Sequence, residues 1–119
     1  MKKIKIMIIY LNSPWFELVK EGKKIYEGRR YTKIIENIKI NDILEVRHYV
    51  KKEVESFNII VLDKLYYKTF EHALQCLNIN EVLPIENITL EQGIDIYKQF
   101  VSLATQEKDG VCMLKIKVV

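Results

Sequence analysis

The sequence predicts an α+β fold in which helices pack against one curved, mainly antiparallel sheet or a small β-barrel. Candidate strands gather at both ends of the chain, and candidate helices lie between them. Residues 112–118 alternate apolar and polar side chains, and residues 4–11 are rich in isoleucine, so both stretches read as strands. We therefore expect the first and last strands to take part in the same sheet.

A short helix is expected directly after the opening strand. Asn12-Ser13 supplies side chains that can cap a helix, and Pro14 suits the first helical position because the first turn leaves backbone amides unpaired. Gly22 is well placed to end this helix, since glycine readily adopts the left-handed conformation found at helix ends. Residues 24–31 then form the second expected strand.

Turns and strands alternate through the middle of the chain. Residues 32–37 predict a short turn of helix, and Asn41-Asp42 is a turn signal before a strand over residues 43–50. A polar connection at residues 51–53 precedes a further strand over residues 57–66. The alternation of apolar and polar side chains gives the 43–50 strand two different faces.

Two helices are expected after these strands. Thr69 can cap one that runs to about Leu77. The segment Thr89-Leu90-Glu91-Gln92 fits a capping box, in which the Thr and Gln side chains each accept a hydrogen bond from the other residue's backbone amide. Asp109-Gly110 is a turn signal, and the alternation that follows it gives the last strand a clear inside and outside.

Length and composition place the chain among single-domain soluble proteins. Of its 119 residues, 49% are hydrophobic and 29% are charged, which suits one domain with one core. No apolar run approaches the ~20 residues that a membrane helix needs, and the apolar part of residues 1–6 is too short for a signal peptide. We expect an intracellular, cytoplasmic protein without membrane contact, with a nuclear or host-cell location left open.

Cysteine and histidine spacing predicts no metal site, and we expect no cofactor. Cys76 and Cys112 are far apart and belong to no Cys/His cluster, so we expect two buried, free thiols. His48 and His72 have no obvious catalytic partner. The sequence contains no Walker loop and no GxGxxG, HExxH or GxSxG motif, so nothing in it supports the enzyme classes built on those motifs.

Positive charge is concentrated in the first half of the chain. The net charge is +3, but residues 1–60 hold 13 Lys and Arg against 8 Asp and Glu, whereas residues 61–119 hold 6 against 8. A basic half suits contact with nucleic acid, and chance asymmetry is the alternative. Tyr49 and the Tyr66-Tyr67 pair can stack on bases, or can pack with their hydroxyls at the surface.

The most informative segment lies at residues 22–29, where Lys24, Glu27 and Arg29 occur close together. An ammonium, a carboxylate and a guanidinium in this arrangement can bind a phosphate, read a base edge or polarise a carbonyl. Strand alternation places Glu27 and Arg29 on one side and Lys24 on the other, so convergence needs a turn at Gly22 or a bulge at Gly28. The alternative is a solvated basic strand.

The stretch from Pro14 to residue 29 resembles the ASCH domain family, a group of PUA-like domains. That family shows a Pro-Trp helix start followed by Gly-x-Lys-x-x-Glu-Gly-Arg, and this chain has Pro14-Trp15 and then the same pattern at residues 22–29. Weaker matches follow in the family's order at residues 68–74, 82–84 and 94–100. The resemblance covers roughly residues 8–118.

The resemblance implies a PUA-like β-barrel of about six mainly antiparallel strands with helices packed at its openings. The family is associated with RNA binding, so the implied partner is RNA, single-stranded nucleic acid, a nucleotide or a nucleoside. The implied site is a cleft near the motif. Its residues in this sequence are Asn12, Ser13, Trp15, Lys24, Glu27 and Arg29.

One branch of the family hydrolyses 4-acetylcytidine and carries a threonine where Glu27 stands here. A glutamate at that position can act as a general base on water, but it cannot serve as the hydroxyl nucleophile. We therefore do not expect efficient hydrolysis of 4-acetylcytidine by this protein.

Three hypotheses for function follow. In a nucleic-acid or nucleotide-binding module, Arg29 and Lys24 would contact a phosphate or base carbonyl, Glu27 would accept from an exocyclic amine, and Trp15 or a tyrosine would stack. In a small hydrolase, either a nucleoside amidohydrolase or a ribonuclease, Lys24 and Glu27 would be catalytic. In a protein-binding domain, Glu27 and Arg29 would form only a structural ion pair. The oligomeric state is left open.

Overall fold

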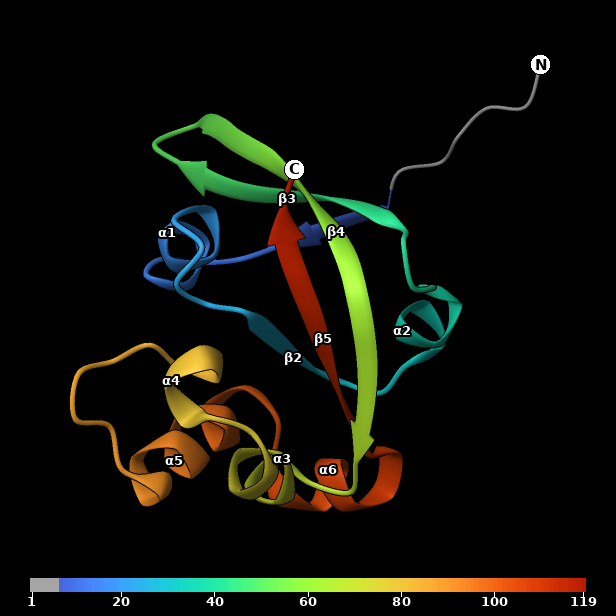
Figure 1. The fold of residues 1–119 in the computed structure, drawn as a ribbon, viewed down its shortest axis with the longest axis vertical. Helices are drawn as coiled ribbons and strands as arrows, with labels where there is room; N and C mark the ends of the chain where they lie inside the picture. Colours follow the sequence, from blue (N-terminus) through green and yellow to red (C-terminus); the bar gives the residue numbers. More distant parts are fainter. Residues whose placement is uncertain (1–6) are drawn as a thin grey trace.

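The computed structural model describes residues 7–119, which form a curled sheet flanked by short helices (Figure 1). The strands are β1 (Met7–Tyr10), β2 (Tyr26–Arg30), β3 (Ile43–Val50), β4 (Glu53–Tyr67) and β5 (Val111–Val118). The helices are α1 (Trp15–Lys20), α2 (Lys33–Asn37), α3 (Phe70–Cys76), α4 (Ile79–Val82), α5 (Leu90–Phe100) and α6 (Leu103–Asp109).

The sheet has the strand order β1-β3-β4-β5-β2. β1 runs parallel to β3, and the other three pairings are antiparallel, so the prediction of a mainly antiparallel sheet that contains the first and last strands is confirmed. The expected barrel of about six strands is not found. Within the described residues, five strands form a mixed, curled half-barrel, because β1 and β2 stand at opposite ends of the strand order. Residues 4–6 of the expected first strand lie outside the described part.

The curl of the sheet depends on the long strand β4. Its first half pairs with β3 and its second half with β5. Val61 pairs with Ile116 and Asp63 with Lys115, so Leu62 is an extra residue that forms a bulge and bends the strand. The strand begins earlier than the sequence predicted because Lys51 and Lys52 both adopt positive φ, which makes a two-residue hairpin between β3 and β4.

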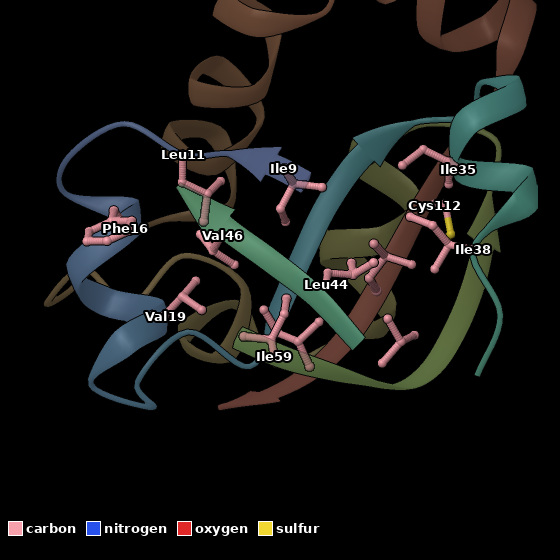
Figure 2. Packing of buried hydrophobic residues seen from close by; sticks show 13 residues of the cluster. Ile9, Leu11, Phe16, Val19, Ile35, Ile38, Leu44, Val46, Ile59 and Cys112 are labelled. Carbon is pink, nitrogen blue, oxygen red and sulfur yellow. The ribbon is translucent and has the colours of Figure 1, made fainter. Parts of the chain in front are cut away.

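One hydrophobic core fills the inside of the curl (Figure 2). β1 contributes Ile9, β3 contributes Leu44 and Val46, and α1 contributes Phe16 and Val19. The other members come from the loop after β1, from α2 and its C-terminal end, and from β4 and β5, namely Leu11, Ile35, Ile38, Ile59, Val61, Cys112, Leu114 and Ile116. The burial of Phe16 and Val19 attaches α1 to the half-barrel.

A second core lies between the sheet and the helices α3 to α5, which gather at one end of the molecule (Figure 1). Val111 and Met113 of β5 point into this second core, whereas Cys112 and Leu114 point into the first. The expected polar outside of the last strand is therefore limited to its C-terminal part, where Lys117 is exposed. β5 is buried on both faces because it lies between β4 and β2 and under the helical layer.

Local capping signals locate α3 and α5 correctly, but the sequence analysis expected only two helices after the strands and did not predict α4 or α6. Thr69 caps α3, and Thr89 with Gln92 forms the capping box of α5. The prediction for α1 is wrong in detail: Pro14 is the cap residue, no side chain caps the helix, and the Ser13 hydroxyl donates instead to the Glu17 carboxylate at 2.5 Å.

The structure also bears on the cysteines, on metal binding and on membrane spanning. Cys76 is exposed on α3 rather than buried, because it occupies the solvent side of a short helix, and Cys112 is buried as expected. Among residues 7–119, no group of three or more His, Cys, Asp or Glu side chains is arranged to hold a metal ion. None of the described helices is both long and apolar enough to cross a bilayer.

Candidate functional site

The side chains of Lys24, Glu27 and Arg29 converge. The Lys24 Nζ atom lies 3.7 Å from Oε1 of Glu27, and Nη2 of Arg29 lies 3.1 Å from Oε2 of the same carboxylate. Nε of Arg29 also donates to Oε2 at 3.1 Å. One carboxylate therefore lies between two cations, as the shared-site prediction requires.

Lys24 reaches this position because it precedes the strand rather than belonging to it. Gly22 adopts φ of +78°, and the amides of Lys23 and Lys24 both donate to the carbonyl of Leu18, which wraps the chain tightly around the end of α1. The alternation of β2 begins only at Tyr26. The turn at Gly22 thus brings Lys24 to the same side as Glu27, while Gly28 causes no bulge in the regular pairing of β2 with β5.

The Lys24 ammonium has a structural role. It is only 3% exposed, and it donates to the carbonyl of Tyr26 at 2.7 Å and to the carbonyl of Val82 at the end of α4. It also lies 5.6 Å from the centre of the Trp15 ring. Burial lowers the pKa of Lys24, and the Glu27 carboxylate opposes this shift. Lys24 therefore holds α4 against β2 and places a positive charge behind Glu27.

Arg29 connects the two ends of the sheet. While Nε and Nη2 contact Glu27, Nη2 also donates to the backbone carbonyl of Tyr10 at 3.0 Å. Tyr10 is the last residue of β1, and Arg29 belongs to β2. With 31% of its side chain exposed, Arg29 is the cation of this cluster that solvent and a ligand can reach.

Tyr97 on α5 lines the site, although nothing in the sequence marked it as a candidate site residue. Its hydroxyl is buried and has no hydrogen-bond partner among residues 7–119. Burial and the Glu27 carboxylate raise the pKa of Tyr97 well above its usual range, so the hydroxyl stays protonated at neutral pH. A buried hydroxyl without a partner costs stability unless something else accepts its hydrogen bond.

The glycine of the motif makes room for Tyr97. A Cβ atom on Gly28 would lie 2.8 Å from Oη of Tyr97, 2.9 Å from Phe70 and 3.0 Å from Sδ of Met113. The rings of Phe70 and Tyr97 stack with their centres 4.0 Å apart. A glycine inside a strand pattern can mark either a bulge or a close approach of this kind; the sequence analysis considered only the bulge at Gly28.

These groups lie at a cavity of about 510 Å³. It opens between β1, β2, α2 and α5, and its polar lining includes Asn12, Lys24, Glu27, Arg29 and Tyr97. Trp15 also lines it, whereas Ser13 does not, because the Ser13 hydroxyl is directed toward Glu17 and His48. Apolar side chains make up most of the wall, including Ile9, Leu11, Ile34, Ile35, Phe70, Leu83, Ile96, Phe100 and Val101.

The cavity combines complementary hydrogen-bonding groups with apolar walls. Oε2 of Glu27 is occupied by Arg29, but within the described residues Oε1 accepts no hydrogen bond and faces only the Lys24 ammonium at 3.7 Å. Tyr97 offers one donor, and Arg29 offers its partly exposed guanidinium. The volume falls in the range of small-molecule sites, roughly 300–1,000 Å³.

Comparison with known proteins shows that the fold recurs. The crystal structure of "hypothetical protein PH0355" matches with a TM-score of 0.82 and 28% sequence identity, over 97% of this chain and 100% of that chain. The solution NMR structure of protein PF0455 from Pyrococcus furiosus matches with a TM-score of 0.76 and 25% identity, over 97% of this chain and 98% of that chain. No protein-family model and no curated protein sequence matches this chain.

Proposed function

We propose that this protein is an ASCH-type binding module that holds one nucleoside, free or within RNA, with its base in the cavity between β1, β2, α2 and α5. The observation that carries the proposal is that two groups in the cavity accept or donate no hydrogen bond among residues 7–119. Oε1 of Glu27 can accept a hydrogen bond, and the buried hydroxyl of Tyr97 can donate one. A base edge that presents a donor beside an acceptor satisfies both.

The walls of the cavity support a planar ligand. Trp15, Phe70 and Phe100 line it together with several aliphatic side chains, and such surfaces pack well against the face of a base. Free phosphate is a poor ligand for the interior, because the buried Glu27 carboxylate would face it and the two neighbouring cations already contact that carboxylate. The partly exposed guanidinium of Arg29 is the group that would contact a phosphate or a sugar hydroxyl near the opening.

Lys24 has a different role in this proposal from the one expected at first. Its ammonium is committed to two backbone carbonyls, so it would act on the ligand only through Glu27. Its positive charge offsets the negative charge of Glu27 and keeps that side chain in place. We therefore assign direct ligand contacts to Glu27, Arg29, Tyr97 and Trp15, with Asn12 at the wall.

A small hydrolase is the second candidate, and the same open oxygen atom favours it. Oε1 of Glu27 could take a proton from water beside a bound amide or phosphodiester, with the Tyr97 hydroxyl donating to the developing oxyanion. Binding requires only the hydrogen bonds, whereas turnover also requires a water molecule held in line. A chromatographic assay of incubated nucleosides and short RNA separates the two candidates.

Thermal unfolding in the presence of a panel of nucleosides, mononucleotides and short RNAs tests the proposal. A ligand at about 100 times its dissociation constant should raise the free energy of unfolding by about 2.7 kcal/mol. Glu27→Gln should weaken binding of the same ligand, while Lys117→Gln, at an exposed lysine of β5, should not. If no member of the panel stabilises the protein, the cavity does not bind nucleosides and the proposal fails.

A further inference from the structure

Two exposed tyrosines lie side by side next to the cavity. The rings of Tyr10 on β1 and Tyr49 on β3 are nearly parallel, with an angle of 12° between their planes and 5.7 Å between their centres. They are 51% and 59% exposed. Tyr10 also lines the cavity, so the pair lies at the edge of the cavity.

The tyrosines belong to the outward face of the sheet near the β3–β4 hairpin. Tyr49 pairs with Val54 across the hairpin, and Tyr10 pairs with Arg47 across the β1–β3 ladder. Val54 is 49% exposed, and the neighbouring Ile8 on β1 is 37% exposed. Because the two rings stack on each other, their outer faces and the exposed apolar groups beside them are what a further ring can pack against.

Positive charges flank this surface. Arg47 lies two residues before Tyr49 and therefore shares its face, where it forms an ion pair with Glu45. Lys51 and Lys52 form the exposed tip of the hairpin, directly beyond β3. Glu53 and Glu55 flank Val54 in the alternation of β4, so they belong to the opposite face.

We propose that Tyr10 and Tyr49, together with Arg47, Lys51 and Lys52, bind a single strand of nucleic acid that continues out of the cavity. The bases next to the one in the cavity would stack on the tyrosine pair, and the cations would contact their phosphates. This inference rests on the proposed function of the cavity, and it selects a nucleotide strand, rather than a free nucleoside, as the ligand. A protein partner would bury the same apolar groups; the exposed lysines at the hairpin tip favour a polyanion instead.

Fluorescence anisotropy with a labelled eight-nucleotide RNA and the DNA of the same sequence tests the proposal. Tyr49→Leu should weaken oligonucleotide binding about tenfold, since a base stacked on an aromatic ring contributes ~1–3 kcal/mol. Tyr66→Leu is the matched control, because Tyr66 is also an exposed strand tyrosine, 57% exposed, but lies at the other end of β4. Tyr49→Leu should leave nucleoside binding unchanged, because Tyr49 does not line the cavity.

The cations are tested by the salt dependence of the same binding. Replacing Lys51 and Lys52 by Gln should reduce the log–log salt slope by about 1.4, at ~0.7 for each lost phosphate contact on a single strand. Gln keeps a side chain at both positive-φ positions, so the backbone requirement is unchanged. The control is the pair Lys68→Gln and Lys117→Gln, at two exposed lysines away from the hairpin.

The outcomes distinguish this inference from the function of the cavity. If nucleosides bind but the oligonucleotide binds no tighter, or if Tyr49→Leu binds it as well as the wild type does, the strand surface is refuted and the cavity function stands. If the oligonucleotide binds through Tyr49 while no nucleoside binds, the strand surface stands and the cavity function fails. If neither ligand binds, both fail.

Discussion

Arg29 and Tyr10 join the two ends of the half-barrel. Nη2 of Arg29, on β2, donates to the backbone carbonyl of Tyr10, on β1, at 3.0 Å, although these two strands stand at opposite ends of the strand order. The same guanidinium holds the Glu27 carboxylate at 3.1 Å. Arg29, the residue best placed to contact a ligand, therefore also links the two edge strands of the sheet. Its replacement should affect both stability and binding.

Arg29→Ala should remove ligand binding and lower the free energy of unfolding by about 1–3 kcal/mol, because it removes charge-assisted hydrogen bonds to Glu27 and the contact with Tyr10. Arg29→Lys should recover part of the stability but little of the binding, since an ammonium cannot reproduce the planar set of donors. Urea unfolding and titration with the ligand measure both effects. If Arg29→Ala cannot fold, the role of the Glu27–Arg29 pair is purely structural. If the variant binds the ligand with unchanged affinity, Arg29 does not belong to the binding site.

Lys24→Met should be costlier than Arg29→Ala. It leaves the carbonyls of Tyr26 and Val82 without their donor and removes the cation behind Glu27, so we expect a loss of about 3–5 kcal/mol. Lys23→Met is the matched control, because the neighbouring side chain is 65% exposed, and it should change stability by less than about 0.5 kcal/mol.

The double variant Lys24→Met/Glu27→Gln checks the reason for this loss. Because it removes both buried charges, its loss in free energy of unfolding should be smaller than the sum of the losses of the two single variants. Denaturant unfolding of all four proteins gives the coupling energy. Additive losses would show that the two side chains do not stabilise each other.

Local signals in the sequence predicted the local structure well. Thr69 and Thr89 cap helices as expected, and Gly22 and Asn41 take the left-handed conformations that their turns require. Such features depend on a few neighbouring residues. The parallel pairing of β1 with β3 depends on segments more than thirty residues apart, and no local pattern encodes it.

The candidate site was predictable only where its geometry depends on neighbouring residues in the sequence. Glu27 and Arg29 share a side because of strand alternation, which the sequence shows. The burial of Lys24 and the approach of Tyr97 depend on α4 and α5, which pack onto β2 from far along the chain. Gly28 was the one local sign of that approach.

Gly28→Ala should destabilise the protein by about 1–3 kcal/mol and weaken ligand binding, because the new methyl group would lie within 3.0 Å of Tyr97, Phe70 and Met113. Thermal or urea unfolding measures the loss. In Gly28→Ala/Tyr97→Phe the nearest clashing atom, the hydroxyl oxygen, is absent, so part of the stability should return. Normal stability of the single variant would mean that α5 can move away from β2 at little cost.

Tyr97→Phe should separate stability from function at neutral pH. Removing a buried hydroxyl that has no partner should leave stability unchanged or raise it by about 1 kcal/mol. The same change removes the donor that we assign to the ligand, so affinity for the nucleoside should fall about tenfold. A variant that loses stability and retains affinity would show that the hydroxyl serves the fold instead.

Tyr97 should make the stability of the folded protein fall at alkaline pH. The pKa of Tyr97 is raised in the folded protein by burial and by Glu27, so below its ordinary value of 10.0 both folded and unfolded chains keep the proton and Tyr97 adds no pH dependence. Above pH 10 the unfolded chain ionises while the folded chain does not, and the wild type should lose up to about 1.4 kcal/mol per pH unit through this residue. Tyr97→Phe lacks the ionisable group, so the difference in free energy of unfolding between this variant and the wild type should grow in favour of the variant between about pH 10 and pH 11.

Urea unfolding at a series of pH values measures this difference, with Tyr66→Phe, at an exposed tyrosine, as the control expected to follow the wild type. If the free energy of unfolding of the wild type and of Tyr97→Phe changes with pH in the same way, water reaches the Tyr97 hydroxyl in the folded protein.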